Sequence, residues 1–158
     1  MTQQVTKPDH ASWRKGEIAE TLFMAGAMVH DWDIFVPLGH AHATDVCIAK
    51  PWLPAIKVQV KTAWHDESCN RYRIPLMKCN GRGKKQMYGS GDFDVLAGYL
   101  PDLNQFVLWA FDDISGRQKI DYHPDRHRKP SNWELLDNVA QSLTNSRGMT
   151  APVPPPSL

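Results

Sequence analysis

The spacing of apolar side chains predicts a long helix near the N-terminus, over Trp13–Val29, with Ser12 as its N-cap. Its apolar positions fall on two stripes, of which one carries Ile18, Leu22, Ala25 and Val29. The other stripe carries Trp13, Gly16, Phe23, Met24 and Ala27. A helix that is apolar on two sides is expected to be covered on both, as by packing against a sheet. Glu20 lies on the second stripe, where a carboxylate is partly desolvated and needs a partner.

Beyond this helix, alternation with a period of two predicts strands at 33–37, 44–49, 56–63, 94–100, 106–111 and 119–122. The third strand has the clearest pattern, and it requires Gln59 and Lys61 to project from the same face. Residues 50–54 contain two prolines and are interpreted as a turn between two hairpin strands. A last helix is expected to be capped by Ser131 or Asn132 and to run through Leu143.

The order of these elements is helix, three strands, a loop, more strands and a helix, which predicts a layered α/β or α+β fold. A chain of 158 residues suits one domain with its own core. We assign residues 12–144 to this domain, residues 1–11 to a flexible arm, and the proline-rich residues 145–158 to a disordered tail.

Composition limits the classes of function. The formal net charge is +1, so binding to nucleic acid must rest on local patches and not on an overall positive field. The three cysteines are odd in number and show no framework spacing, which indicates a reducing compartment. The sequence has no signal-peptide pattern and no apolar run of membrane-spanning length. We therefore expect a soluble cytoplasmic protein with no membrane partner.

Four polar residues carry the candidate chemistry: Glu20, Asp45, Gln59 and Lys61. Hydrolysis of a phosphodiester needs a divalent cation that neutralises the phosphate and lowers the pKa of a bound water. Mg²⁺ prefers carboxylates, backbone carbonyls and waters as ligands. We expect Asp45 to be the main ligand, the carbonyl of Val60 to be a second, and Glu20 to complete the site directly or through water.

Lys61 is expected to orient the attacking water or to stabilise the developing charge on the phosphate, and Gln59 to position water or metal. An acid followed by a polar residue and a lysine is a common pattern on solvated surfaces. Here the residues fall where periodicity predicts burial, on strands that are adjacent in sequence. The four residues are thus predicted to form the catalytic set of a metal-dependent nuclease.

The segments 16–20, Thr44–Asp45 and 59–63 resemble the PD-(D/E)xK nuclease superfamily, and within it the group I intron homing endonucleases. The likeness covers about residues 13–111. Most members carry Glu or Asp where this chain has Gln59, but the homing branch shares the Gln; the lost charge points to modest metal affinity.

The resemblance implies a restriction-endonuclease-like core, with a central mixed sheet flanked by helices. It also implies cleavage of double-stranded DNA with Mg²⁺, for which Mn²⁺ substitutes, by a homo-oligomer that is a dimer or a tetramer.

Two alternatives stay open. The first is another nuclease on the same fold, such as a Holliday junction resolvase or a restriction-type enzyme. The second is a DNA-binding module whose nuclease site has decayed, which would bind DNA without cutting it. Intact Glu20, Asp45 and Lys61 argue against decay.

Residues 68–91 include no acidic residue. The basic residues of this stretch are expected to contact DNA phosphates, with some arginines reading guanine edges: Arg71, Arg73, Lys78, Arg82, Lys84 and Lys85. The alternative is a solvated, flexible loop. A weaker basic cluster follows at Arg126, His127, Arg128 and Lys129.

Other metal-ligating residue types form weaker patterns. Cys47, His65, Cys69 and Cys79 lack the paired spacing of structural zinc sites, so we do not expect zinc. Loop histidines such as His40 and His42 seldom serve as ligands, although they lie close to Asp45 in sequence. Asp92 and Asp94 are placed outside the catalytic set, with Asp94 as a support residue at the start of a strand.

Overall fold

The computed structural model describes residues 10–38, 43–79, 83–127 and 129–148. Three α-helices lie in this part of the chain: α1 (His10–Val29), α2 (Phe111–Ile114) and α3 (Glu134–Ser146). Residues 1–9 and 149–158 of the predicted arm and tail lie outside it, as do His40, His42, Arg82 and Arg128.

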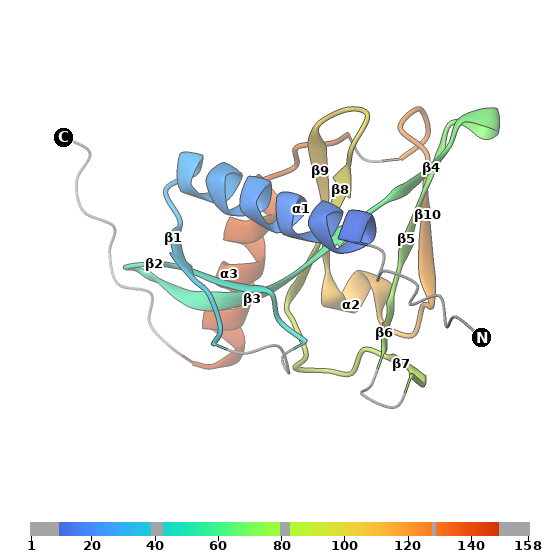
Figure 1. Ribbon diagram of the computed structural model, residues 1–158. Helices are drawn as coiled ribbons and strands as arrows, with labels where there is room; N and C mark the ends of the chain where they lie inside the picture. Colours follow the sequence, from blue (N-terminus) through green and yellow to red (C-terminus); the bar gives the residue numbers. More distant parts are fainter. Residues whose placement is uncertain (1–9, 39–42, 80–82, 128, 149–158) are drawn as a thin grey trace.

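A five-stranded sheet forms the centre of the molecule (Figure 1). In spatial order its strands are β1 (Asp33–Phe35), β2 (Val46–Lys50), β3 (Leu53–Thr62), β8 (Val95–Leu100) and β9 (Gln105–Ala110). β3 and β8 run parallel, whereas the other neighbours are antiparallel. The sheet is therefore mixed and flanked by helices, which confirms the predicted fold class.

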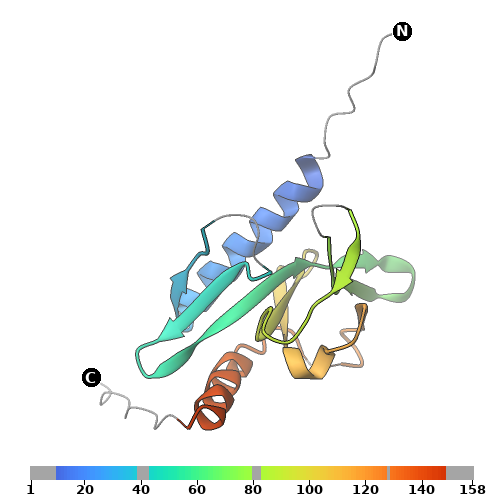
Figure 2. The same ribbon diagram turned by 90° about the horizontal axis from the view of Figure 1, so that it is seen from below.

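A second, three-stranded sheet has the order β10-β5-β4 and comprises β4 (Trp64–Asp66), β5 (Arg71–Pro75) and β10 (Lys119–Tyr122). A single 3₁₀ turn, Glu67–Cys69, joins β4 to β5. β6 (Met77–Cys79) and β7 (Lys85–Met87) form a separate hairpin. One residue separates β3 from β4, so the chain runs on from the central sheet into the second one (Figure 2). The expected loop over 68–91 thus contains the strands β5, β6 and β7.

The central sheet is covered on both faces. On one face, Ile56, Val58 and Val60 pack in one core cluster with residues of α1 and α3. On the other face, Leu96 and Val107 pack in a second cluster with residues of β5 and β10. Because both faces are covered, all six residues of β8 are buried.

Helix α1 differs from its prediction in two ways. It begins at His10, so Ser12 lies inside the helix and is not its cap. It buries one stripe only: Ala19, Phe23 and Ala27 are fully buried, whereas Ile18 is 48% exposed and Val29 is 80% exposed. Periodicity identified two apolar stripes, but the sheet offers α1 a single surface.

Two further boundaries differ from the sequence prediction. β2 begins at Val46, which leaves Asp45 in the segment before the strand. Helix α3 begins at Glu134, and Asn132 does not cap it. The Asn132 side chain instead accepts a hydrogen bond from the N–H of Leu108 at 2.9 Å and donates one to the carbonyl of Leu108 at 3.0 Å. The Asn132 side-chain amide is therefore bonded to the backbone of Leu108 on β9 and does not cap α3. Across the described residues, no helix combines the length and apolar character needed to span a membrane.

Candidate active site

The site forms where β2 separates from β3. Val46 pairs with Val58, and one residue earlier the N–H of Asp45 donates to the carbonyl of Val58 at 3.0 Å. Beyond this point the β3 edge is free of strand pairing to β2, and the N–H of Val60 donates to Oδ2 of Asp45 at 2.8 Å. Because N–H and C=O of one strand residue point to the same side, the carbonyl of Val60 also faces Asp45.

Gln59 holds the same carboxylate from β3. Its side chain is only 5% exposed, and its amide Nε2 donates to Oδ2 of Asp45. The same nitrogen lies 3.3 Å from the carbonyl oxygen of Val60. Asp45 is thus fixed by two donors from adjacent residues of one strand.

Glu20 reaches this region from α1. Burial raises the pKa of Glu20, and repulsion by Asp45 and then by Glu17 raises it further, while Lys61 lowers it. Burial also raises the pKa of Asp45, against the opposing effects of the Val60 N–H, Lys61 and Gln59. Asp45 and Lys61 both influence Glu20, and Lys61 influences Asp45, so the three charges lie within electrostatic range of one another. Partly desolvated carboxylates such as these favour a nearby cation.

Lys61 projects from β3 beside the aromatic ring of Tyr88. Its Nζ lies 5.8 Å from the centroid of the Tyr88 ring, and Nζ of Lys78 lies 5.7 Å from the same centroid. Tyr88 in turn packs edge-on against Phe93, with 5.0 Å between centroids. A tyrosine 27 residues away from Lys61 carries no local signal of this contact.

The segment that contains Asp92 is hydrogen-bonded to the residue before Asp45. The hydroxyl of Thr44 donates to the carbonyl of Asp92 at 2.7 Å, which ties the residue before Asp45 to this segment. The carboxylate of Asp92 accepts from Nζ of Lys78 at 2.6 Å and from the N–H of Gly89 at 2.8 Å. Burial alone would raise the pKa of Asp92, but the Lys78 and Gly89 contacts together lower it.

Asp94 joins two strands of the central sheet. Its carboxylate accepts from the N–H of Lys57 at 2.8 Å, and its own N–H donates to the Lys57 carbonyl at 2.8 Å. These contacts link the start of β8 to Lys57, two residues before Gln59 on β3. Asp92 and Asp94 thus have structural partners outside the predicted catalytic set.

The donor set fits a hard cation. It offers the carboxylates of Glu20 and Asp45 and the carbonyl of Val60, which are oxygen ligands of the kind that Mg²⁺ takes together with waters. Within the described ranges, no group of three or more His, Cys, Asp or Glu residues could hold a metal. Cys47 and Cys69 are free thiols, and His65 stacks on Tyr72 with 4.2 Å between centroids.

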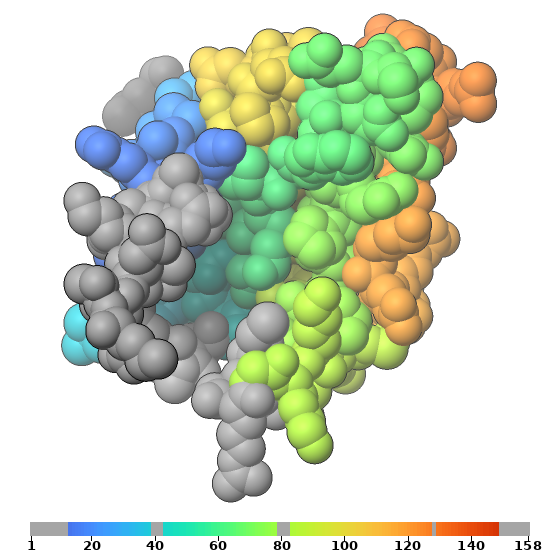
Figure 3. Space-filling view, turned by 45° about the vertical axis from the view of Figure 1, so that its right-hand side comes forward, coloured from blue at the N-terminus to red at the C-terminus, as the bar shows by residue number. Residues whose placement is uncertain are grey.

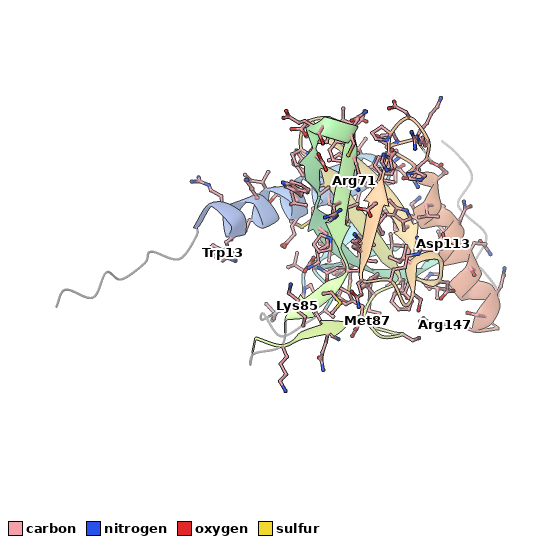
Figure 4. All side chains as sticks on the ribbon, turned by 90° about the vertical axis from the view of Figure 1, so that its right-hand side faces the viewer. Trp13, Arg71, Lys85, Met87, Asp113 and Arg147 are labelled. Atoms are coloured by element: carbon pink, nitrogen blue, oxygen red, sulfur yellow. The ribbon has the colours of Figure 1, made fainter. Side chains whose placement is uncertain are left out.

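Several of the predicted DNA-contacting residues are already paired with acids from elsewhere in the chain. Arg71 contacts Asp66 at 2.8 Å and Arg73 contacts Asp121 at 3.0 Å. Lys78 contacts Asp92, as described above. Lys84 and Lys85 are exposed, and Lys85 lies on β7 (Figure 4).

The weaker basic cluster is also partly structural. The Nδ1 atom of His127 accepts a hydrogen bond from the N–H of His123 at 2.8 Å, which closes the loop after β10. Arg126 and Lys129 are exposed. The DNA contacts proposed for both clusters stay predictions.

Comparison with known proteins identifies the family. The model of the PD-(D/E)XK endonuclease family matches residues 10–137. A solved structure titled as that of a bacterial homing endonuclease, I-Ssp6803I, aligns with a TM-score of 0.68 at 26% sequence identity. The alignment covers 86% of this chain and 97% of that one. A search of curated proteins finds no significant match. The chain belongs to the PD-(D/E)XK endonuclease family, whose members act on DNA and generally use divalent metal ions.

Proposed function

We propose that this endonuclease hydrolyses phosphodiester bonds of double-stranded DNA with Mg²⁺, as a sequence-specific homing endonuclease. The observation that carries the proposal is the Asp45 carboxylate held by the Val60 N–H, with Glu20 and Lys61 within electrostatic range of it, in a chain of this family. The structural likeness to a homing endonuclease over most of both chains supports the homing function.

Asp45 is the main metal-binding residue in this proposal, with Glu20 and the carbonyl of Val60 beside it. Mn²⁺ is expected to substitute, because it shares the preference for oxygen ligands. When bound, the cation neutralises phosphate charge and lowers the pKa of its water. Removing a metal with a chelator should therefore abolish cleavage but leave the fold in place.

Lys61 is the group that meets the reacting phosphate. Its charge lowers the pKa of both acids, which supports a role for its ammonium at the same phosphodiester. There it can hold the attacking water or offset the charge that develops on phosphate oxygen. The Tyr88 ring limits where this long side chain can go.

The β6–β7 hairpin is the best-placed element for DNA contact. It projects from the body of the molecule (Figure 3), and its residues Lys84 and Lys85 are exposed. Lys78 of β6 contacts the Tyr88 ring that also contacts Lys61, so the hairpin adjoins the catalytic strand. Arg71 and Arg73 would exchange Asp66 and Asp121 for phosphates on binding DNA. The DNA that this enzyme would act on, together with its free Cys47 and Cys69, favours a cytoplasmic location.

A cleavage assay on pooled long duplex DNA, with Mg²⁺ or with EDTA, tests the proposal. Wild-type protein should give discrete products in Mg²⁺ only. Asp45→Ala and Lys61→Ala should each lower the rate by about 100-fold or more, because each removes a group that stabilises transition-state charge. Glu134→Ala, an exposed acid on α3, is the matched control and should cut normally.

The other outcomes identify the alternatives. Cutting of branched DNA regardless of sequence would indicate a junction resolvase. Tight binding by wild-type protein without cutting, unchanged by either substitution, would contradict the catalytic proposal and favour a decayed binding module.

A further inference from the structure

Gln59 occupies the position where most superfamily members carry an acid, and its hydrogen bonds show what the amide does instead. Nε2 faces Oδ2 of Asp45 and the carbonyl oxygen of Val60. An ionised carboxylate and a backbone carbonyl are acceptors only. The amide must therefore present its NH₂ group to them, because the reversed amide would place a third oxygen against two others.

The Val60 N–H donates to the same Oδ2 at 2.8 Å. Two N–H donors together occupy the two lone pairs of this oxygen. Oδ1 is then the oxygen of Asp45 that remains for a cation. The Asp45 carboxylate is held in one orientation, with its occupied oxygen toward β3.

We propose that Gln59 is a positioning residue and not a metal ligand: its amide NH₂ and the Val60 N–H close Oδ2 of Asp45 and leave Oδ1 to bind the metal. The metal-binding part of this inference rests on the proposed function. The direction of the hydrogen bond from Gln59 to Asp45 is a property of the metal-free protein. A neutral donor at this position also spares the metal-free site a third carboxylate beside Asp45 and Glu20.

A double-mutant cycle in EDTA tests the polarity of this contact. Gln59→Glu places a carboxylate against Asp45 and should lower the melting temperature. Adding Asp45→Asn removes one of the two facing carboxylates: the NH₂ group of the new asparagine can donate to the carboxylate of the new glutamate, at the loss of the hydrogen bond from the Val60 N–H to the oxygen it replaces. The double variant should therefore melt about 5 °C higher than the sum of the two single effects predicts. Additive effects would overturn the proposal, whether or not the protein is a nuclease.

Metal affinity tests the positioning role itself. Calorimetric titration with Mn²⁺ should show affinity about 10-fold weaker in Gln59→Leu, as for loss of a partner that orients a ligand. Asp45→Ala should bind no measurable Mn²⁺. Gln141→Leu, on the exposed face of α3, is the matched control and should bind as wild type. Complete loss of binding in Gln59→Leu would make Gln59 a ligand and contradict the proposal, as would unchanged affinity. Failure of wild-type protein to bind Mn²⁺ would count against the proposed function instead.

Discussion

Two carboxylates that are partly withdrawn from water and placed near each other destabilise a folded protein until a cation joins them. Glu20 and Asp45 are in this situation, since burial raises the pKa of both and the charge of Asp45 raises that of Glu20 further. Lys61, Gln59 and the Val60 N–H offset the effect only in part. The site therefore carries a stability cost in the metal-free protein that a bound cation would relieve.

The sign of this cost gives a prediction for Asp45→Asn. A raised carboxyl pKa means that the folded state binds the proton more tightly than the unfolded state does. The stability that comes from this tighter proton binding is fully present below the ordinary carboxyl pKa, and it is lost as the pH rises through the raised pKa. In EDTA at neutral pH, Asp45→Asn should thus melt a few degrees above wild type, and the difference should shrink on acidification.

Thermal melts of both proteins across a pH series check this prediction. In Mg²⁺ the order should reverse, because only wild-type protein is stabilised by binding the metal. A gap between the two proteins that widens as the pH falls would contradict the assignment of Asp45 as a destabilised carboxylate.

At the scale of elements, the pattern of the sequence predicted the type of most elements but not where several of them end. Period-two alternation correctly placed Gln59 and Lys61 on one face of β3. The start of β2 one residue after Asp45 depends on the hydrogen bonds of Thr44 to Asp92 and of Asp45 to Val58, which join segments far apart in sequence. The start of α3 likewise depends on where Asn132 finds a partner on β9.

The packing of α1 against the segment that enters α3 gives a prediction for Gly26. A Cβ at Gly26 would lie 2.6 Å from two ring carbons of Trp133. That indole cannot move easily, because it stacks between Phe23 and His30, with centroids at 5.5 Å and 5.1 Å. Gly26→Ala should cost about 1–3 kcal/mol, seen as a fall of roughly 3–10 °C in melting temperature.

Gly16 on the same helix is the matched control. A Cβ there meets no atom within 4 Å, so Gly16→Ala should gain up to about 1 kcal/mol from helix propensity alone. Equal changes in melting temperature for the two substitutions would contradict this prediction. They would show that helix propensity, and not contact with Trp133, determines the effect of an alanine at position 26.

At the scale of the whole molecule, the sequence predicts a candidate catalytic set, whereas the charges that surround its residues leave no local pattern. The catalytic set follows from short-range patterns and from family resemblance. The basic stretch looked uncompensated because its partners, Asp66, Asp121 and Asp92, lie outside it in sequence. The contact of Tyr88 with Lys61 and the hydrogen bond of Thr44 to Asp92 are likewise tertiary contacts that leave no local pattern in the sequence.

The exposed apolar residues on the N-terminal half of α1 bear on assembly. One active site cuts one strand, so double-strand cleavage calls for at least two copies of the chain. The N-terminal end of α1 projects from the molecule and carries Trp13, which is 65% exposed (Figure 4). Ile18 on the same half of the helix is 48% exposed. We therefore expect this half of α1 to pack against a second copy.

Light scattering after size-exclusion chromatography should give wild-type protein a mass at least twice that of one chain. Ile18→Asp should shift the mass toward the monomer, because burying an unpaired carboxylate in an apolar contact is costly. Its cleavage should change from double-strand breaks to nicks, since each separated copy keeps its own Glu20, Asp45 and Lys61. Leu103→Asp, at an exposed turn between β8 and β9, is the control and should keep the wild-type mass. A monomeric wild type that still makes double-strand breaks would contradict the assembly, and would require one site to cut both strands in turn.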